Sequence, residues 1–423
     1  MIEGISFLKK RRFPPNRNKF KFDLIFSPIL IGPFILVVVS SVLIKSIQNQ
    51  SNNNDFLSHL LTGIFGYFLA IMISNIPLDR IKKYVFPFYI ISILSLIFVY
   101  FFGITIYGAQ RWLSLGLFTF QPSEVAKLST LLVIALVLEK NKIYSLKDLV
   151  KPIILVSIPW ILIFFQPDLG TSLVLIFLFF VMLYWAQMPI EWILIVVLSL
   201  FTSLFSFVSP FILFLWIPLM GLLAFKSLER RIIFAIITMA FHTIIAKLTP
   251  FLWNFGLKDY QKDRLILFID PSRDPLGGGY HLLQSKIAIG SGGIFGSGFL
   301  KGKLTNLNFI PEQHTDFIFS ALGEETGFIG SFLVVCIFFI LIIQLTRIAK
   351  NARTDFESLI VIAIASIFLF QIIINIFMTI GLGPVTGIPL PFMSYGRTSL
   401  LINFSCIGFA LSTSKRARSL RNL

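Results

Sequence analysis

Long apolar stretches alternate with short polar connections along most of the chain. A helix of about 20 apolar residues crosses the roughly 30 Å hydrocarbon core of a bilayer. Twelve stretches of about that length occur, and each predicts a membrane-spanning helix. They are centred on 24–46, 57–78, 84–106, 122–139, 149–166, 168–186, 190–208, 210–226, 230–250, 315–345, 356–380 and 390–413. Residues 190–250 could be divided differently, and the length of 315–345 predicts a helix that is tilted or extends beyond the bilayer.

Basic residues gather in alternate connections. With twelve spans, the basic segments all fall on one side of the membrane: 1–23, 79–83, 139–151, 226–231, 346–353 and 414–423. Lys and Arg mark cytoplasmic connections, so we expect both termini in the cytoplasm. The other side carries the uncharged segment 48–54 and the longest connection, 251–314. A connection of that length predicts a large extracytoplasmic loop with a functional role.

The composition agrees with a membrane protein. Of the 423 residues, 56% are hydrophobic and only 13% are charged. The net charge of +16 follows the topology, so we expect anionic lipid headgroups as its partners and no nucleic acid. Cys336 and Cys406 both lie in apolar stretches, with neither a disulfide framework nor metal-ligand spacing. The sequence predicts a single all-α polytopic membrane domain, residues 24–413, between two basic tails.

Five polar clusters interrupt the apolar pattern, and the topology places all five on the extracytoplasmic side. Ionisable groups beside spanning segments are costly and mark functional sites. The first cluster, 107–127, holds Arg111, and it places Glu124 and Lys127 on one helical face. In one reading, Glu124 and Lys127 are a pair that neutralises itself in the bundle. In the other reading, Lys127 and Arg111 face an anionic ligand. The second, FQPDLGTS at 165–172, presents Asp168 either as a helix cap or as a group in the extracytoplasmic mouth.

The third cluster, 273–302, is rich in glycine and shows almost no continuous helix pattern. No register in it fits a dinucleotide or P-loop motif. A glycine-rich, partly apolar loop outside a membrane predicts a re-entrant segment that lines a cavity. Arg273, His281 and Lys286 would form its polar edge. A lone histidine is more often structural than catalytic, so both roles stay open for His281.

The fourth cluster lies at the start of the apolar stretch 315–345, and the fifth lies between the last two apolar stretches. In FIPEQHTDFIF, 309–319, Asp316 begins a span and is either a helix-start acid or a general base whose pKa partial burial raises. His314 and Thr315 are candidates for orienting it. Glu324 and Glu325 follow within the span and need partners or protonation there. The fifth cluster, 381–399, breaks the helix pattern with Pro and Gly and ends in a polar tip, Ser394, Tyr395 and Arg397.

Together the five clusters offer carboxylates, cations and glycine-rich walls at one membrane face. This inventory suits a lipid-linked phosphate substrate, because cations hold phosphates, an acid handles a proton and apolar helices hold the tail. The motifs also resemble, in order from about residue 107 to the C-terminus, the SEDS family of cell-wall polymerases. They are GAQRWLSLG, FQPSEVAK, QPDLGTS, DPLGGGYHLLQSKIAIGSGGIFGSG, PEQHTDFIF, GEETGF and GIPLPFMSYG. The GYHLLQSKIAIGSGG loop is closer to the RodA-like, elongation branch than to the FtsW-like, division branch.

The resemblance implies a SEDS-type bundle of about 10–12 transmembrane helices in the bacterial plasma (inner) membrane. Ten spans are usual in the family, so two of the helices in 190–250 are read as additions. The usual SYGG reads SYGR here, with Arg397 at the last position, which leaves the role of the fifth cluster open. The implied activity is polymerisation of lipid II during elongation, with a class B penicillin-binding protein and the elongation machinery as partners.

The resemblance also implies site residues and a mechanism. Asp316 matches the essential acid, Glu124 and Lys127 match a family pair, and Arg111 and Asp168 match cavity-lining positions. Asp316 would deprotonate the acceptor sugar's 4-hydroxyl while polyprenyl pyrophosphate leaves the donor. The substrate-binding candidates are Arg111, Glu124, Lys127, Asp168, Arg273, His281, Lys286 and His314. A divalent cation, Mg²⁺ or Mn²⁺, could share the pyrophosphate, although no metal-ligand motif requires one. The alternatives are a lipid II flippase, the division polymerase and a scaffold without chemistry.

Overall fold

The computed structural model describes most of the chain beyond its N-terminal tail. The described residues are 27–48, 54–106, 109–114, 116, 119–141, 143, 145–227, 230–256, 259–270, 273–274, 278–307, 309–310 and 312–421. The long helices are α2 Pro28–Ile47, α3 Asp55–Ser74, α4 Leu78–Phe102, α5 Pro122–Lys140, α6 Leu146–Phe165, α7 Leu169–Trp185, α8 Ile190–Val208, α9 Pro210–Ser227, α10 Arg231–Phe251, α14 Ile318–Lys350, α15 Asp355–Ile380 and α16 Arg397–Arg421. The short elements are β1 Ile104–Ile106, β2 Ala109–Ser114, β3 Thr119–Phe120, η1 Leu252–Gly256, α11 Asp259–Ile269, α12 Gly278–Ser291 and α13 Lys303–Asn306. The predicted tail 1–23 and most of the segment 48–54 lie outside the described residues.

The predicted polytopic helical bundle is confirmed. Within the described residues, nine helices are long and apolar enough to cross a membrane. The other long helices are α7, which is apolar but has only 17 residues, and α5 and α16, which carry more charged or polar side chains. The helix predicted at 84–106 begins earlier, at Leu78, because the basic segment 79–83 forms its first turns.

Helix α15 lies at the centre of the main bundle, with 72% of its most apolar segment buried. It packs against α14, α7, α5 and α16. Several polar side chains within the bundle form hydrogen bonds across helices, as most buried polar groups do. The Ser92 and Ser129 hydroxyls, from α4 and α5, lie 2.5 Å apart, and the Tyr89 hydroxyl donates to the Leu155 carbonyl at 2.8 Å. These bonds fix α4 against α5 and α6.

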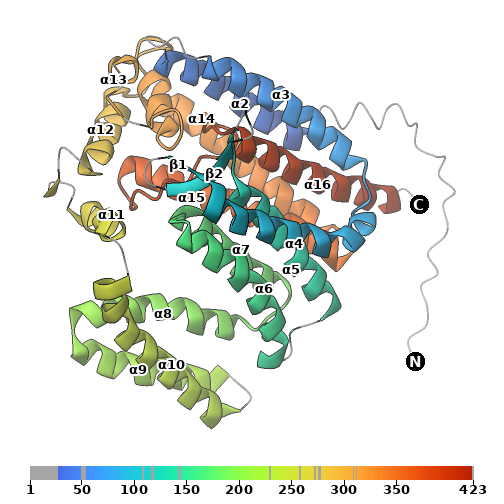
Figure 1. Ribbon diagram of the computed structural model, residues 1–423, viewed down its shortest axis with the longest axis vertical. Helices are drawn as coiled ribbons and strands as arrows, with labels where there is room; N and C mark the ends of the chain where they lie inside the picture. Colours follow the sequence, from blue (N-terminus) through green and yellow to red (C-terminus); the bar gives the residue numbers. More distant parts are fainter. Residues whose placement is uncertain are drawn as a thin grey trace.

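Helices α8, α9 and α10 form a unit beside the main bundle (Figure 1). They pack mainly on one another, and α8 also contacts α7. Inside the unit, the Thr202 hydroxyl lies 2.6 Å from His242 Nδ1 and accepts a hydrogen bond from the Trp216 indole at 3.0 Å. All three predicted helices are present. The prediction that two of them are additions to a ten-helix fold remains a prediction.

The connection 251–314 is more helical than the sequence predicts. The expectation of little continuous helix in 273–302 is wrong, because α12 occupies Gly278–Ser291. Two glycines after α12, Gly292 and Gly296, bring the loop against the backbone of α14. A Cβ on Gly296, at φ 81°, would lie 2.2 Å from the Glu325 carbonyl oxygen. The Ser297 and Gly298 amides donate to the Glu324 and Glu325 carbonyls at 3.0 and 2.9 Å.

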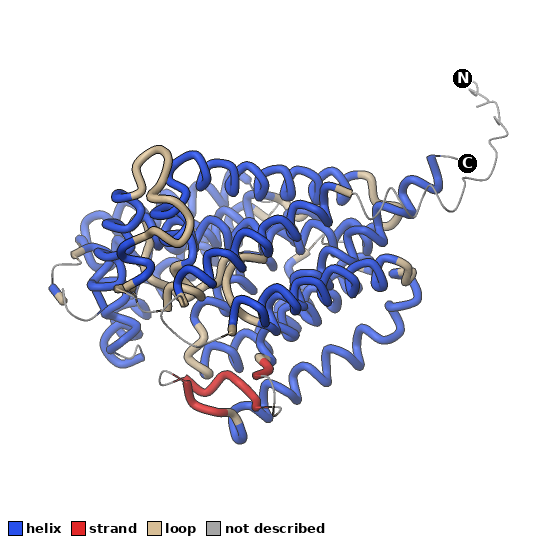
Figure 2. The backbone as a smooth tube through the Cα atoms, turned by 90° about the horizontal axis from the view of Figure 1, so that it is seen from above, coloured by secondary structure: helices blue, strands red, loops and turns tan. Residues whose placement is uncertain are grey.

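Three short antiparallel strands add a feature that the sequence analysis did not anticipate. They form a sheet in the order β1-β2-β3, with Thr105 opposite Gln110 and Leu113 opposite Phe120. Figure 2 shows the strands at the edge of the bundle. The sheet connects the end of α4 to the start of α5, and it positions Arg111 beside the beginning of α7.

Candidate active site

All five predicted polar clusters meet at one end of the main bundle, which we call the site end. The first contacts the fifth, since the Thr398 hydroxyl donates to the Thr119 carbonyl at 3.2 Å. The third packs on the fifth, since a Cβ on Gly381 would lie 2.8 Å from Lys286 Cε. The fourth contacts the fifth, because the Tyr395 amide donates to the His314 carbonyl at 2.9 Å. Helices α11, α12 and α13 also lie at this end, opposite the C-terminus of α16 (Figure 1).

Arg111 and Asp168 join the first cluster to the second. Arg111 Nη1 lies 3.7 Å from Asp168 Oδ1, and Arg111 Nε donates to the Gln166 carbonyl at 3.2 Å. Another guanidinium nitrogen donates to the Pro167 carbonyl. Arg111 therefore binds the turn that precedes α7 as well as the carboxylate at its end.

Asp168 is the N-cap of α7, so the predicted capping role is present. Its carboxylate accepts hydrogen bonds from the Thr171 amide at 3.2 Å and the Thr171 hydroxyl at 2.9 Å. Ser123 and Gln121, at the start of α5, approach the same carboxylate at 3.3 and 3.5 Å. Asp168 is buried, and this network holds it as an ionic and hydrogen-bonded link between α5, α7 and β2.

Asp316 lies half-buried in the turn that leads into α14. The Asn375 side-chain amide donates to its carbonyl oxygen at 2.8 Å. Its carboxylate faces the fifth cluster closely enough that a Cβ on Gly387 would lie 3.2 Å from Oδ2. Burial, and after it the Glu312 charge, raise the pKa of Asp316 to about 6 against the opposing charges of Arg264 and Arg111. A carboxyl with this pKa is ionised at neutral pH and is a stronger base than an ordinary aspartate.

Two charged neighbours of Asp316 were not among the predicted site residues. Arg264, on α11, donates from Nη1 to the Thr386 carbonyl at 3.1 Å and acts electrostatically on Asp316. Glu312 also acts electrostatically on Asp316, but its negative charge raises the pKa of Asp316. The Glu312 carbonyl accepts a hydrogen bond from the Asp316 amide at 3.1 Å. We call Arg111, Asp168, Arg264, Glu312 and Asp316 the charged cluster. The signal for Arg264 was weak, because the arginine lies outside the glycine-rich segment.

The histidines lie beside this cluster. His281 stacks on Phe317 with ring centroids 6.1 Å apart, and its buried Nδ1 has no hydrogen-bond partner within the described part of the chain. Burial lowers the pKa of His281, and the Glu312 charge opposes this. The His314 ring lies 5.8 Å from the Tyr395 ring. The expected orienting role of Thr315 is not seen, because its hydroxyl donates to Glu312 rather than to Asp316.

Glu124 and Lys127 form an ion pair at 2.8 Å, and each side chain is only 3% exposed. The Cys406 thiol of α16 lies within electrostatic range of both charges. This geometry supports the reading in which the pair neutralises itself. Among the described residues, Glu124 Oε2 is buried without a hydrogen-bond partner.

The remaining candidates are more peripheral. Lys286, on α12, is exposed, and its aliphatic stem packs within 2.8 Å of the Cβ position of Gly381. Arg273 has a side chain that is 66% exposed, and its ion pair is with Asp270 at 3.8 Å; the structure does not bring it into the charged cluster. The deeper acids have partners, since Glu324 accepts from the Leu304 and Thr305 amides at 2.9 Å and Glu325 accepts from Ser46.

Among the described residues, no group of three or more His, Cys, Asp or Glu side chains is placed to hold a metal ion. Mg²⁺ can be held by one or two carboxylates together with substrate phosphates. The protein side chains of the charged cluster therefore do not by themselves define a site for the Mg²⁺ or Mn²⁺ considered from the sequence.

Comparisons with known proteins agree over nearly the whole chain. The model of a family of cell cycle proteins, FtsW/RodA/SpoVE, matches residues 22–217 and 210–419. The peptidoglycan glycosyltransferase MrdB of Escherichia coli K12 is 34% identical over 402 residues, which covers 94% of this chain and 96% of that protein. The peptidoglycan glycosyltransferase RodA of Treponema pallidum is 33% identical, covering 86% and 90%. A probable peptidoglycan glycosyltransferase FtsW of Wigglesworthia glossinidia brevipalpis is 32% identical, covering 95% and 94%.

Solved structures share the fold. A chain from a study of how a peptidoglycan synthase complex coordinates polymerization and crosslinking is 26% identical, with a TM-score of 0.65 over 91% of this chain and 97% of that one. The rod shape determining protein RodA of Thermus thermophilus is 23% identical, with a TM-score of 0.59 over 92% and 95%. At that identity, the second likeness supports the fold alone.

Proposed function

Because the chain belongs to the FtsW/RodA/SpoVE family of cell cycle proteins, we propose that it is a peptidoglycan glycosyltransferase that polymerises lipid II with Asp316 as its general base. The relatives named above carry the glycosyltransferase activity in their names. The observation that carries the residue assignment is the place of Asp316. Its carboxyl is half-buried where the polar clusters meet, and its pKa is raised to about 6.

In the proposed reaction, two lipid-linked saccharides bind side by side at the site end. The Asp316 carboxylate accepts the proton of the acceptor sugar's 4-hydroxyl while that oxygen attacks the anomeric carbon of the donor. The bond between that carbon and the pyrophosphate oxygen breaks, and polyprenyl pyrophosphate leaves with the electron pair. A raised pKa favours this proton transfer, since a base works best when its pKa approaches the operating pH.

The cations of the charged cluster would stabilise the leaving group. Arg111 and Arg264 are the two guanidinium groups whose charges act on Asp316, so a pyrophosphate beside Asp316 would lie near both. Charge-assisted bonds from Arg to phosphate oxygens are strong and directional. Lys286 on α12 is exposed at the same end and would reach a second phosphate or a bound saccharide.

The displacement inverts the donor carbon. An α-linked donor becomes a β-linked product in one step, so the reaction requires no covalent enzyme intermediate. The two acids of the charged cluster other than Asp316 have different tasks. Asp168 caps α7 and pairs with Arg111, while Glu312 binds Thr315 and raises the pKa of Asp316.

The chain is a multi-pass inner-membrane protein by its apolar helices and its family. We propose further that both termini are cytoplasmic and that the site end is extracytoplasmic. The basic connections lie at the opposite end of the bundle, and Lys and Arg mark cytoplasmic connections. A class B penicillin-binding protein as partner and a role in elongation belong to the same proposal. The structural relative from a peptidoglycan synthase complex supports the partner, and the GYHLLQSKIAIGSGG loop supports the elongation branch.

The experiment that tests the function uses purified protein in detergent micelles with fluorescent lipid II. Micelles have no second leaflet, so a flippase has no reaction to perform there. We expect glycan strands from the wild type, more of them with the penicillin-binding partner, and about 10²- to 10⁴-fold less from Asp316→Asn. Strong polymerisation by Asp316→Asn would remove Asp316 from the chemistry. Failure of the wild type with its partner present would favour the flippase.

A further inference from the structure

A cavity lies at the end of the bundle opposite the charged cluster, which we call the far end. Helix α7 begins at Asp168, beside the charged cluster, and ends at Trp185, 17 residues later, or about 25 Å away along a helix. The cavity is 610 Å³ and lies where the α5–α6, α7–α8 and α14–α15 connections meet. Its wall includes Trp185, Gln187, Lys350, Arg353, Asp355 and Ser358.

The charged groups of this far-end pocket are mostly cationic. Neither Lys350 nor Arg353 forms an ion pair within 4 Å with another described residue. Both side chains are exposed at the pocket wall. Arg353 acts electrostatically on Glu357, which is buried beneath the wall. The acid in the lining, Asp355, lies in the first turn of α15, where it balances the helix dipole.

The aromatic wall of the pocket is fixed in place. The Trp185 indole donates to the Ser358 hydroxyl at 2.8 Å, and that hydroxyl donates to the Ala349 carbonyl at 2.8 Å. Gln187 has a φ of 65° and turns the chain sharply between α7 and α8. This conformation is costly for a residue other than glycine and is held by its surroundings.

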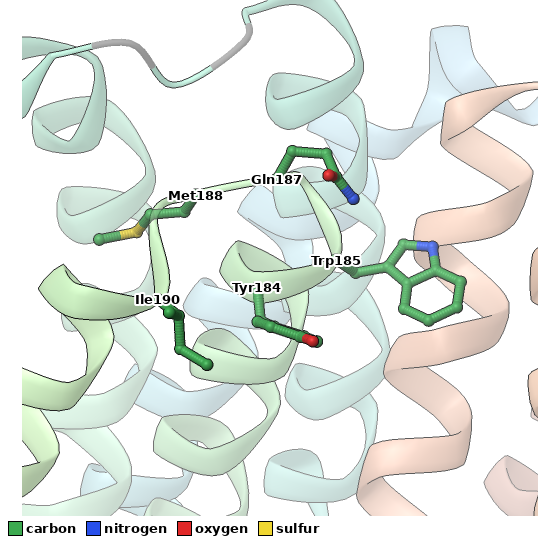
Figure 3. Close-up of a pocket in the computed structure, with 5 residues that line it drawn as sticks. All are labelled: Tyr184, Trp185, Gln187, Met188 and Ile190. Atoms are coloured by element: carbon green, nitrogen blue, oxygen red, sulfur yellow. The ribbon is translucent and has the colours of Figure 1, made fainter.

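A smaller cavity of 260 Å³ adjoins the same turn and shares Trp185 and Gln187 with the first. Figure 3 shows Trp185 extending to one side of the turn, and Met188 and Ile190 to the other. Tyr184 and Ile190 line this smaller cavity and are 54% and 48% exposed. The turn therefore has a pocket with two cations and a hydrogen-bonded indole on one side, and the apolar side chains of Met188 and Ile190 on the other.

We propose that the far-end pocket binds the phosphate headgroup of an anionic phospholipid, with one acyl chain along Tyr184 and Ile190. Basic pockets between membrane helices on the cytoplasmic side, where the proposed topology puts the far end, suit such headgroups, and Trp is enriched at the membrane interface. The site is separate from the charged cluster. A lipid there would brace the α7–α8 turn, which joins the α8–α10 unit to the main bundle.

The test measures binding of dioctanoyl phosphatidylglycerol to the full chain in a non-ionic detergent. Dioctanoyl phosphatidylcholine tests for the headgroup charge, and glycerol 1-phosphate tests for a free phosphate ligand. We expect saturable binding of the first. The double variant Lys350→Gln, Arg353→Gln should weaken it at least about tenfold, since each cation near an anionic lipid surface contributes about fivefold. The matched control is Lys147→Gln, Lys151→Gln. It removes the same charge from exposed positions at the same end, on α6, and we expect a change of less than about twofold.

A second variant guards against misfolding of the first. Ala352→Trp fills the pocket while it keeps both cations, and it should also weaken binding about tenfold or more, because an added indole occupies the headgroup volume. Thermal unfolding of each variant is measured first. Equal losses in the pocket and control variants would overturn the proposal, as would equal affinity for phosphatidylcholine. Binding of glycerol 1-phosphate as tight as that of the lipid would reassign the pocket to a free phosphate ligand.

Discussion

The side-chain amide of Asn375 donates hydrogen bonds to the carbonyl oxygens of Asp316 and Ile388, both at 2.8 Å. Asn375 is fully buried in α15. It therefore ties the segment that carries Asp316 to the loop that contains Gly387, and both to the central helix of the bundle. The position of the proposed base depends on this bridge.

Replacement of Asn375 by Leu should lower both stability and activity. The change keeps the volume but leaves two carbonyls without a donor, at about 1–3 kcal/mol each when buried. Thermal unfolding and lipid II polymerisation measure the two effects. Thr379→Val is the control one turn later on α15, since the Thr379 hydroxyl donates only within its own helix, to the Ile376 carbonyl at 2.8 Å. Equal effects of the two variants would contradict the bridge.

The activity should follow the ionisation of Asp316. The base acts when deprotonated, and its pKa is raised to about 6 by burial and by Glu312. We expect kcat/KM to be level above this pH and to fall about tenfold for each pH unit below it. A profile recorded between pH 4.5 and 8.5 measures this. An inflection near the ordinary aspartate value would contradict a raised pKa.

The same shift predicts a stability effect with a definite sign. Because the pKa of Asp316 is higher in the folded protein, folding favours its protonated form, and the ionised form costs stability as pH rises past the unfolded value. Asp316→Asn removes this cost at neutral pH. We therefore expect the inactive variant to unfold at the same temperature as the wild type or a higher one. A lower unfolding temperature would show that the carboxylate is needed for folding.

Arg111→Lys should impair the enzyme although the charge is retained. A lysine cannot reproduce the bonds from the guanidinium to the Gln166 and Pro167 carbonyls while it faces Asp168. We expect kcat/KM to fall about 10- to 100-fold, the equivalent of one or two charge-assisted hydrogen bonds. Arg273→Lys is the matched control, because that side chain is exposed and outside the charged cluster. A similar loss in both variants would show a general effect of loop charge.

Lys127→Met should destabilise the bundle strongly and weaken activity. It leaves Glu124 buried beside an apolar side chain, and breaking a buried ion pair costs about 3–5 kcal/mol. The double variant Glu124→Gln, Lys127→Met removes both charges and should recover most of that stability. Unfolding temperatures of the wild type, Lys127→Met and the double variant measure the loss and the recovery. Unchanged stability and activity in Lys127→Met would reject both roles considered for the pair.

Much of the architecture follows from the sequence because a membrane constrains local patterns. Each span needs an apolar stretch of about 20 residues whose backbone hydrogen bonds form within the helix. Helices such as the one at 356–380 can therefore be predicted directly from the sequence. The polar clusters were found for the same reason, since groups such as Asp168 and Asp316 are costly in such a chain unless they have a role. Their gathering at one end follows from counting spans.

Only the tertiary structure decided which of those groups act on one another. Arg264 reaches Thr386 and Asp316 across long sequence separations, whereas Arg273, from the same connection, does not join them. The glycines after α12 are used for close approach to the kinked backbone at Gly327, a purpose that composition cannot distinguish from a cavity lining. Hydropathy is a property of neighbours along the chain, while the pKa of Asp316 and the far-end pocket arise from helices that meet only on packing.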